Sequence, residues 1–383
     1  MNEPPPLPGS TSGSRTNDAG QSIDDGKGRT FPCQQCGADL RFSIGQQQLQ
    51  CPFCGWTKAI AFDEATAAAE QDYGAMLGRL TLLREQGRTD KVAASEIRCS
   101  SCGATVVFTE TLTSTECGCC GSPLQRENVH DSPDRVPVDG VLPFHVEQTR
   151  AAANLAAWVQ SRWFAPNEFR RRGVNAKFNG LYLPFWTFDT MAHTRYSGQR
   201  GEHYTVTVGT GQNKREETRT RWRHASGSFE QFFDDVLVSA TTAVPKRLLD
   251  ALEPWSLDKC APFSQQLLAG FLAQTYSVPL DKGFDEAKVR MEGALRVEVK
   301  RRIGGDEQRI DSMHVWHAAI KYKHLLLPVW LMAYRFRDKT YQVVVNANSG
   351  EVQGERPYSW VKILLFVAGL ATAIGAIVVI ANR

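Results

Sequence analysis

Eight of the ten cysteines form two matching sets that could each hold one metal ion. The first set is Cys33-x-x-Cys36 followed, after fourteen residues, by Cys51-x-x-Cys54, and the second is Cys99-x-x-Cys102 followed, after fourteen residues, by Cys117-x-x-Cys120. Each member of the second set lies 66 positions after its counterpart. Four thiolates are a common ligand set of structural zinc. The spacing therefore predicts two closed metal sites in which no coordination position is left for a substrate.

The repeat also decides between two neighbouring thiols. The stretch TECGCCGSPL, residues 115–124, offers both Cys119 and Cys120 as the partner of Cys117. Cys120 corresponds to Cys54, and each is followed by a glycine, which tolerates the positive φ needed to leave the turn. We therefore expect Cys120 to be a ligand and Cys119 to be a spacer thiol that points away from the metal.

Metal binding is favoured over the other uses of such cysteines. Segments of about 22 residues cannot bury a core of their own, so a bound metal must supply folding energy, roughly 10–16 kcal/mol for zinc. The N-terminal residues show no basic or hydrophobic signal pattern, so we expect the cysteines to lie in a reducing compartment, where disulfides are rare. Two structural Zn²⁺ ions are the prediction, while an iron centre of the rubredoxin type has the same ligands and stays open.

Composition and periodicity divide the rest of the chain. The predicted fold is multidomain, with two zinc ribbons, an α+β middle domain (an antiparallel sheet plus helices) and one C-terminal transmembrane helix. The predicted boundaries are a disordered tail at 1–30, ribbon 1 at 31–60, a helical spacer at 61–96 with Asp63 as N-cap, ribbon 2 at 97–126, a linker at 127–140, the α+β domain at 141–357 and the membrane helix at 361–381.

Within the middle domain, one phrase occurs twice. Leu181-Tyr-Leu-Pro-Phe-Trp186 matches Leu325-Leu-Leu-Pro-Val-Trp330, and strand-like residues follow each copy. We expect two related half-domains in which the proline occupies a strand start or an edge. Helices are predicted at 146–164, 245–253, 262–275 and 284–290, strands at 233–240 and 295–303, and a hairpin with its turn at 348–350.

The C-terminal stretch from Ile363 to Ala381 contains no charged residue. A helix of this length spans about 28 Å, close to the hydrocarbon core of a bilayer. The sequence predicts a single-pass tail anchor in contact with membrane lipid, with the preceding chain in the cytosol. Ala371 and Gly375 have the spacing that permits helix pairing, so a homo-oligomer stays open.

No set of catalytic residues can be assigned. The chain contains no G-x-x-x-x-G-K-[ST], G-x-S-x-G or H-E-x-x-H motif. His314 and His317 face opposite ways if their stretch is a strand, and Cys260 has no recognisable base partner. Seven basic residues between Arg195 and Arg223 are predicted on a long solvated hairpin, where binding of lipid headgroups or nucleic acid is the alternative. These observations predict a protein that is not an enzyme.

The duplicated C-x-x-C-G ribbons, the phrase LYLPFWTFD, the closing GERPYSWVK and the apolar C-terminus resemble a bacterial family of membrane-anchored, TFIIB-type double zinc-ribbon proteins. The resemblance covers nearly the whole chain from Phe31 onward. Members are often labelled primosomal protein N′ (replication factor Y), superfamily II helicase, but this chain lacks the nucleotide-binding loop of a helicase. The resemblance implies zinc binding by all eight cysteines and partners among SPFH-type or phage-shock-like membrane-stress proteins.

The leading hypothesis is a non-enzymatic adaptor that docks protein partners at the cytoplasmic face of the bacterial inner membrane. The alternative is a zinc-ribbon protein that binds nucleic acid without a motor. Within residues 31–56 Arg41 is the only basic residue, and within 97–126 only Arg98 and Arg126 are basic. Phosphate contacts would need more positive charge, so nucleic acid is the less favoured partner.

Overall fold

The fold comes from a computed structural model that describes residues 15–16, 22–23, 31, 33–38, 40–60, 68–85, 95–98, 104–108, 114–116, 119, 123–125, 129–130, 136–167, 178–209, 214–336 and 339–381. The elements before residue 140 are β1 (Arg15–Thr16), β2 (Ser22–Ile23), β3 (Arg41–Ser43), β4 (Gln48–Gln50), β5 (Thr57–Ala59), β6 (Gln71–Asp72), α1 (Tyr73–Glu85), β7 (Ser95–Arg98), β8 (Thr105–Phe108), β9 (Ser114–Glu116), β10 (Pro123–Gln125) and β11 (Val129–His130).

The body of the molecule follows. Its elements are β12 (Gly140–Val141), α2 (Gln148–Ser161), β13 (Phe178–Val208), β14 (Arg215–Ser239), α4 (Lys246–Asp250), η3 (Leu257–Lys259), β15 (Ala261–Pro262), η4 (Gln265–Leu268), β16 (Leu272–Ala273), α5 (Leu280–Ile303), β17 (Glu307–Phe336), β18 (Lys339–Asn346), β19 (Val352–Gly354) and α6 (Trp360–Ala381).

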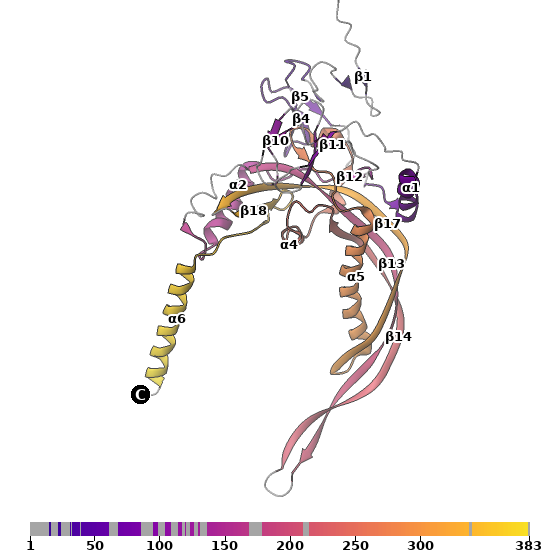
Figure 1. Ribbon diagram of the computed structural model, residues 1–383, viewed down its shortest axis with the longest axis vertical. Helices are drawn as coiled ribbons and strands as arrows, with labels where there is room; N and C mark the ends of the chain where they lie inside the picture. Colours follow the sequence, from indigo (N-terminus) through magenta and orange to yellow (C-terminus); the bar gives the residue numbers. More distant parts are fainter. Residues whose placement is uncertain are drawn as a thin grey trace, which may run out of the picture.

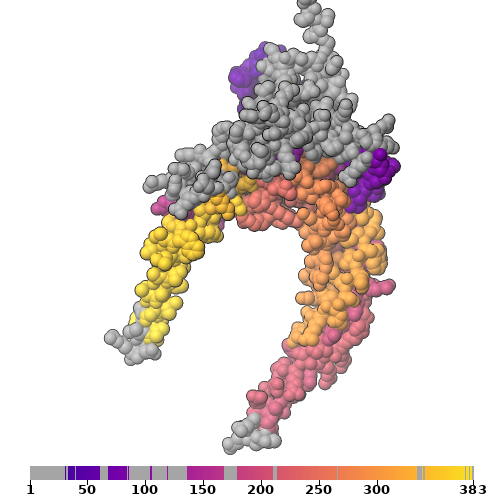
Figure 2. Space-filling view, in the orientation of Figure 1, coloured from indigo at the N-terminus to yellow at the C-terminus, as the bar shows by residue number. Residues whose placement is uncertain are grey.

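One curled sheet dominates the described residues. Its central order is β14-β13-β17-β12-β15, and the pairs of β13 with β14 and with β17 are antiparallel. Figure 1 shows β13, β14 and β17 curving together along α5, while β4 and β5 lie on the opposite, convex side. In Figure 2 the hairpin with α5 forms one limb of an arch and α6 forms the other.

The predicted fold class is therefore wrong. The described chain is mostly a curled antiparallel sheet with few helices, because β13, β14 and β17 run for 31, 25 and 30 residues. Sequence patterns suggested several short strands instead. Irregular pairing lets such long strands bend: the register shifts between Phe188 and Thr190, and opposite this point Asp235 has a φ of 48°.

Two segments of the body repeat the same order of elements. β12, α2, β13 and β14 form the first unit, and β16, α5, β17 and β18 form the second. The two copies of the repeated phrase pair with each other, with Leu183 opposite Leu327. Short strands join in parallel at matching places, Val141 opposite Leu326 and Ala273 opposite Tyr182. The contacts around Leu183 and Leu327 are therefore related by an approximate local two-fold.

The repeated tryptophans make the clearest pair of matching contacts. Trp186 Nε1 donates to Val278 O at 2.9 Å, and Trp330 Nε1 donates to Val146 O at 2.8 Å. Each accepting carbonyl lies just before the helix of the other unit. Each tryptophan thus connects the strand of its own unit to the helix of the other.

The two prolines lie inside strands, so the expectation of a strand start or an edge is wrong. The carbonyls of Pro184 and Pro328 accept from Ala240 N at 2.9 Å and Ala347 N at 3.0 Å. At Pro184 the strand that pairs with the outer edge of β13 changes from β16 to β14. At Pro328 the strand that pairs with the outer edge of β17 changes from β12 to β18. Since N and C=O of one strand residue point to the same side, each proline nitrogen faces this junction.

Several local predictions can be compared directly with the structure. The helix predicted at 146–164, which runs from Gln148 to Ser161, the hairpin of β18 and β19 and the long hairpin of β13 and β14 are confirmed. The predicted helix at 262–275 is wrong, because two short strands flank a single 3-10 turn there. The described spacer helix follows Asp72, whose Oδ1 accepts from Ala75 N at 2.6 Å, and Asp63 lies outside the described residues.

The strand predicted at 295–303 is the second half of α5. Residues 295, 297 and 299 alternate in the sequence, but the buried residues recur every four positions, at Met291, Leu295, Val299 and Ile303. Val297 is 70% exposed. A four-residue period places one face of a helix against β13, β14 and β17.

The C-terminal segment also differs from its prediction. Lys362 Nζ donates to the carbonyls of Trp163 at 3.2 Å and Ala165 at 2.8 Å, and Phe366 packs edge-on against Phe164, so the start of α6 is fixed to the body. Among the helices of the described residues, none has the length and apolar character required to cross a membrane. The predictions of a transmembrane helix at 361–381, a tail anchor and an inner-membrane localisation are therefore wrong.

The two-fold relation predicts equal roles for the two tryptophans. Trp186→Phe and Trp330→Phe each remove one buried hydrogen bond, so each should lower the free energy of unfolding by about 1–3 kcal/mol in urea titrations. Trp316→Phe is the control, because Trp316 is 50% exposed and should cost less than about 0.5 kcal/mol. A large effect at one tryptophan and none at the other would contradict the relation.

A buried carboxyl at the bend predicts a pH dependence. Asp189 is 3% exposed and accepts from Asp235 N at 2.6 Å. Burial raises the pKa of Asp189 to about 6, above its usual value of 3.8. The folded state therefore prefers the protonated form of Asp189. The contribution of this form to the free energy of unfolding is lost as pH rises from about 4 through about 6.

Asp189→Asn should abolish the fall in stability as pH rises from about 4 to about 6. Asn keeps an oxygen for Asp235 N, so the variant should gain about 1–2 kcal/mol relative to the native chain between pH 4 and pH 7. Urea unfolding across this pH range measures the difference. If the difference in the free energy of unfolding between the two proteins does not change with pH, Asp189 does not titrate as described.

Candidate metal centre

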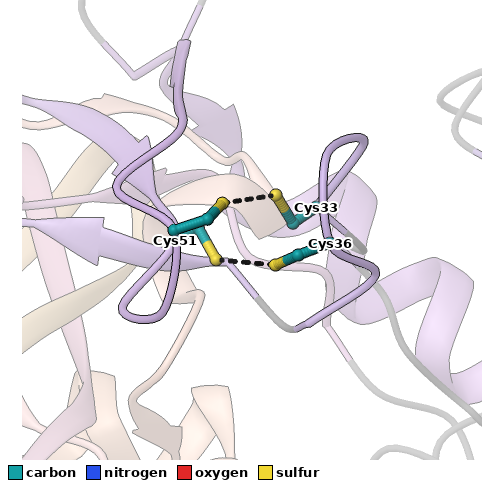
Figure 3. A group of neighbouring side chains, drawn as sticks. Cys33, Cys36 and Cys51 are labelled. Carbon is teal, nitrogen blue, oxygen red and sulfur yellow. Dashed lines mark hydrogen bonds between the residues drawn. The ribbon is translucent and has the colours of Figure 1, made fainter.

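Four cysteines of the first set converge on one point. The Sγ atoms of Cys33, Cys36, Cys51 and Cys54 all lie within 4.8 Å of one another. The Sγ atoms of Cys33 and Cys54 are 3.5 Å apart, and those of Cys36 and Cys51 are 3.4 Å apart. Four sulfurs at about 2.3 Å from a tetrahedral ion would be separated by roughly 3.8 Å. The cluster can therefore bind one metal ion, and Figure 3 shows Cys33 and Cys36 facing Cys51 from a separate loop.

Two matching turns hold these sulfurs. Gly37 N donates to Cys33 O at 2.8 Å, and Gly55 N donates to Cys51 O at 3.1 Å. Both glycines have positive φ, 70° and 75°, which is the conformation expected where the chain leaves each turn. The three-stranded sheet of β3, β4 and β5 joins the turns and fixes their separation.

Backbone amides make the site suited to thiolates. The amide of Cys54, together with that of Phe53, lowers the pKa of Cys51 from 9.0 to about 6 despite its burial. Metal ions bind the thiolate form of cysteine. The turn thus prepares at least one ligand in the required charge state near neutral pH.

The centre is continuous with the core of the body. Cys33 and Cys51 are buried, whereas Cys36 and Cys54 are exposed. Leu40, Phe42 and Leu49 belong to the same apolar cluster as residues of β12, β13 and β17. Because a core of this kind is close-packed, displacement of the turns would disturb the sheet as well.

Hydrogen bonds reinforce this attachment. Phe42 N donates to Ala269 O at 2.9 Å, and Gln47 Nε2 donates to Phe144 O at 3.4 Å. Gly270 has a φ of 86°, and a Cβ there would lie 3.0 Å from Arg41 Cγ, so a larger residue would crowd the contact. Ribbon 1 is therefore packed on the sheet rather than extended away from it.

The second set cannot be compared in the same way. Cys99, Cys102, Cys117 and Cys120 lie outside the described residues. Cys119 is described and fully buried: its Sγ accepts from Gln274 Nε2 at 3.3 Å and its carbonyl accepts from Gln342 Nε2 at 3.0 Å. Sequence reasoning treated Cys119 as a spacer and missed this packing role, for which the only signal was the high frequency of buried cysteines in proteins.

The remaining candidate residues lie apart from the cluster. His314 is exposed on β17, whereas His317 is half-buried with its ring 5.6 Å from that of Phe284. Burial also lowers the pKa of His317 and raises that of Cys260 to about 12. Within the described part of the chain, neither the histidine pair nor the lone thiol belongs to a group of residues that could hold a metal ion.

Charges on the basic hairpin are partly balanced within the chain. Arg200 pairs with Glu202 at 3.2 Å, and Arg219 pairs with Glu217 at 3.5 Å. The guanidinium of Arg221 lies 5.0 Å from the centre of the Tyr204 ring. Part of the positive charge of the hairpin is therefore paired within the chain.

Comparison with known proteins gives one distant similarity. None of the protein families compared matches the chain, and no solved structure matches it. The uncharacterised protein YdjG of Bacillus subtilis (strain 168) is 23% identical over 238 residues, which cover 60% of this chain and 67% of that protein. The name assigns no activity, so function must be argued from the site itself.

The geometry predicts the effect of removing one ligand. Cys36→Ser leaves an exposed hydroxyl in place of an exposed thiol, so it should reduce bound metal by one equivalent per chain. The urea midpoint should also fall, because ribbon 1 shares its core with the sheet. Elemental analysis and urea unfolding measure the two effects.

Gln35→Ser provides the matched control. Gln35 is an exposed neighbour of Cys36 in the same turn, and its replacement should leave the metal content unchanged. Unaltered metal content in Cys36→Ser would rule out the cluster as a metal site.

Proposed function

We propose that the protein is a non-enzymatic adaptor in which a zinc-bound ribbon presents a rigid surface to a protein partner. The proposal is supported by the nature of the cluster. Four thiolates fill a tetrahedral coordination shell, so the ion has no open position for a water or substrate. A closed site contributes stability and shape rather than chemistry.

Zinc is the metal we propose for Cys33, Cys36, Cys51 and Cys54. Four-thiolate zinc sites stabilise small segments that lack a core of their own, which suits the short strands of ribbon 1. The repeat in the sequence extends the same proposal to Cys99, Cys102, Cys117 and Cys120 as a second zinc site. An iron centre would instead absorb visible light, so elemental analysis with an absorption spectrum separates the two metals.

The observation that carries the proposed function is the exposure of Phe53. This ring lies between the ligands Cys51 and Cys54 and is 81% exposed, although large apolar side chains are usually buried. The metal would fix the turn on both sides of it. Aromatic side chains held in a rigid frame are typical anchors of protein interfaces, because little conformational freedom is lost on binding.

The attachment of the ribbon to the sheet adds to this argument. A turn packed on the body presents Phe53 in one orientation, as a preorganised interface requires. The resemblance found in the sequence suggests SPFH-type or phage-shock-like proteins as the partner class. Nucleic acid is the competing partner, but ribbon 1 carries Arg41 as its only basic residue within 31–56.

Crosslinking in cells with the full chain tests the proposal. Phe53→Ala should abolish recovery of the main crosslinked protein while leaving the metal content and the urea midpoint unchanged. Truncating a central interface aromatic typically costs 2 kcal/mol or more, which corresponds to about a 30-fold loss of affinity. The separate readouts distinguish lost docking from lost folding.

Phe232→Ala is the matched control. Phe232 is 57% exposed on β14 and does not belong to ribbon 1, so its replacement should leave the crosslink intact. Equal loss in both variants, or recovery of nucleic acid that persists in Phe53→Ala, would contradict docking through the ribbon.

A further inference from the structure

A cavity of about 520 Å³ lies where α2, the hairpin of β18 and β19 and the segment before α6 meet. Among the described residues that line it, four are basic and one, Glu355, is acidic. The basic residues are Arg162, Arg247, Lys339 and Arg356. Cavities of a few hundred Å³ with convergent polar groups are typical of small-molecule sites.

Glu355 forms an ion pair with one of these basic residues. Its Oε1 accepts from Arg247 Nη2 at 2.5 Å. Among the described residues, no carboxylate forms an ion pair with Arg162, Lys339 or Arg356. Burial, followed by the positive charge of Arg356, lowers the pKa of Arg162. The cavity therefore holds an excess of positive charge that an anion would relieve.

Aromatic rings hold the three unbalanced cations in place. Arg162 lies 4.8 Å from the centre of the Trp158 ring, Lys339 lies 5.4 Å from that of Tyr341, and Arg356 lies 5.3 Å from that of Tyr358. A ring orients a cation without neutralising it. The charges are thus positioned in advance and remain able to bind an anion.

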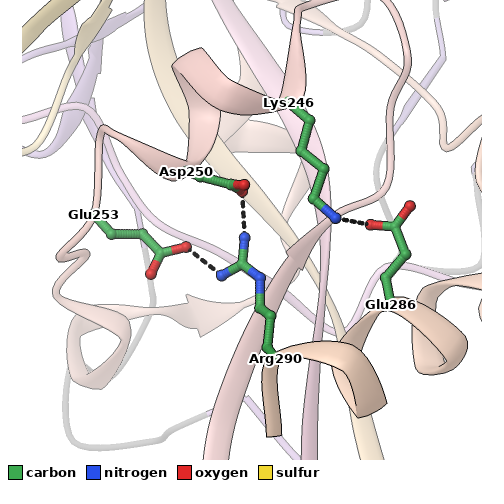
Figure 4. A network of polar contacts seen from close by, with 5 residues as sticks. All are labelled: Lys246, Asp250, Glu253, Glu286 and Arg290. Atoms are coloured by element: carbon green, nitrogen blue, oxygen red, sulfur yellow. Dashed lines mark hydrogen bonds and ion pairs between the residues drawn. The ribbon is translucent and has the colours of Figure 1, made fainter. Parts of the chain in front are cut away.

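The nearby interface between α4 and α5 shows the opposite arrangement (Figure 4). Lys246 pairs with Glu286 at 2.5 Å, and Arg290 pairs with Asp250 and with Glu253. Two cations there meet three carboxylates. The cavity differs from this interface, because its described lining has four basic side chains and one acidic one.

We propose that this cavity binds an organic diphosphate. Three unbalanced cations match the charge of about −3 that a terminal diphosphate carries near pH 7, and guanidinium groups form paired hydrogen bonds with phosphate oxygens. Inorganic phosphate alone would fill only part of 520 Å³, so a phosphorylated small molecule fits better. The site is separate from the cysteine cluster and would give the adaptor a small-molecule ligand.

Isothermal titration of the full chain with ADP and with pyrophosphate tests the proposal. We expect both to bind with micromolar affinity, and citrate, a carboxylate anion of similar charge, to bind at least tenfold more weakly. Lys339→Gln and Arg356→Gln should each weaken ADP binding about tenfold. Lys339 is exposed, so its replacement tests the charge without disturbing the core.

Two further variants make the outcome decisive. Glu355→Gln removes the one carboxylate among the described lining residues and should strengthen ADP binding, an effect that loss of folding could not produce. Arg296→Gln, on the exposed face of α5 where Arg296 pairs with Glu292, should leave binding unchanged. Absence of ADP and pyrophosphate binding at millimolar concentration, equal binding of citrate, or equal loss in Arg296→Gln would overturn the proposal.

Discussion

In the antiparallel pairing of β13 with β17, Leu183 lies opposite Leu327, and the other strands and helices of the body are arranged about this pair. Both side chains are fully buried, and the outer strands, helices and tryptophan hydrogen bonds lie at matching positions on either side. A shift of one residue in this pairing would turn the buried faces of both strands toward solvent. The register of β13 with β17 therefore fixes where ribbon 1, α2 and α5 can pack.

Ribbon 1 uses this body as a foundation. Phe42 and Leu49 enter the apolar cluster that contains Tyr182 and Trp330, so the metal turns and the sheet share one core. A metal ion at the cluster would stabilise the turns, and the sheet in turn orients them. Exposure of Phe53 at the outer end of this rigid unit is the feature that gives the arrangement a use in binding.

The features that depend on residue spacing could be predicted from the sequence. The features that depend on contacts between distant parts of the chain could not. The thiolate set with Cys33 and Cys51 and the echo around Trp186 and Trp330 could be read directly, because residue types and intervals carry them. Val297 misled the analysis, since local alternation resembles a strand while α5 buries every fourth residue. The cavity beside Arg162 joins residues nearly 200 positions apart, as does the contact that fixes Lys362, so neither could be found before the fold was known.

The central claim is that ribbon 1 and the sheet form one cooperative unit held by a metal ion. Hydrogen exchange of the full chain, measured with and without a chelator, tests it most directly. The account predicts that metal removal reduces protection at Cys51 and Phe42 and also at sheet amides such as Leu142 and Ala347, which donate to Leu326 and Pro328. Loss of protection in the ribbon with unchanged exchange in the sheet would contradict it.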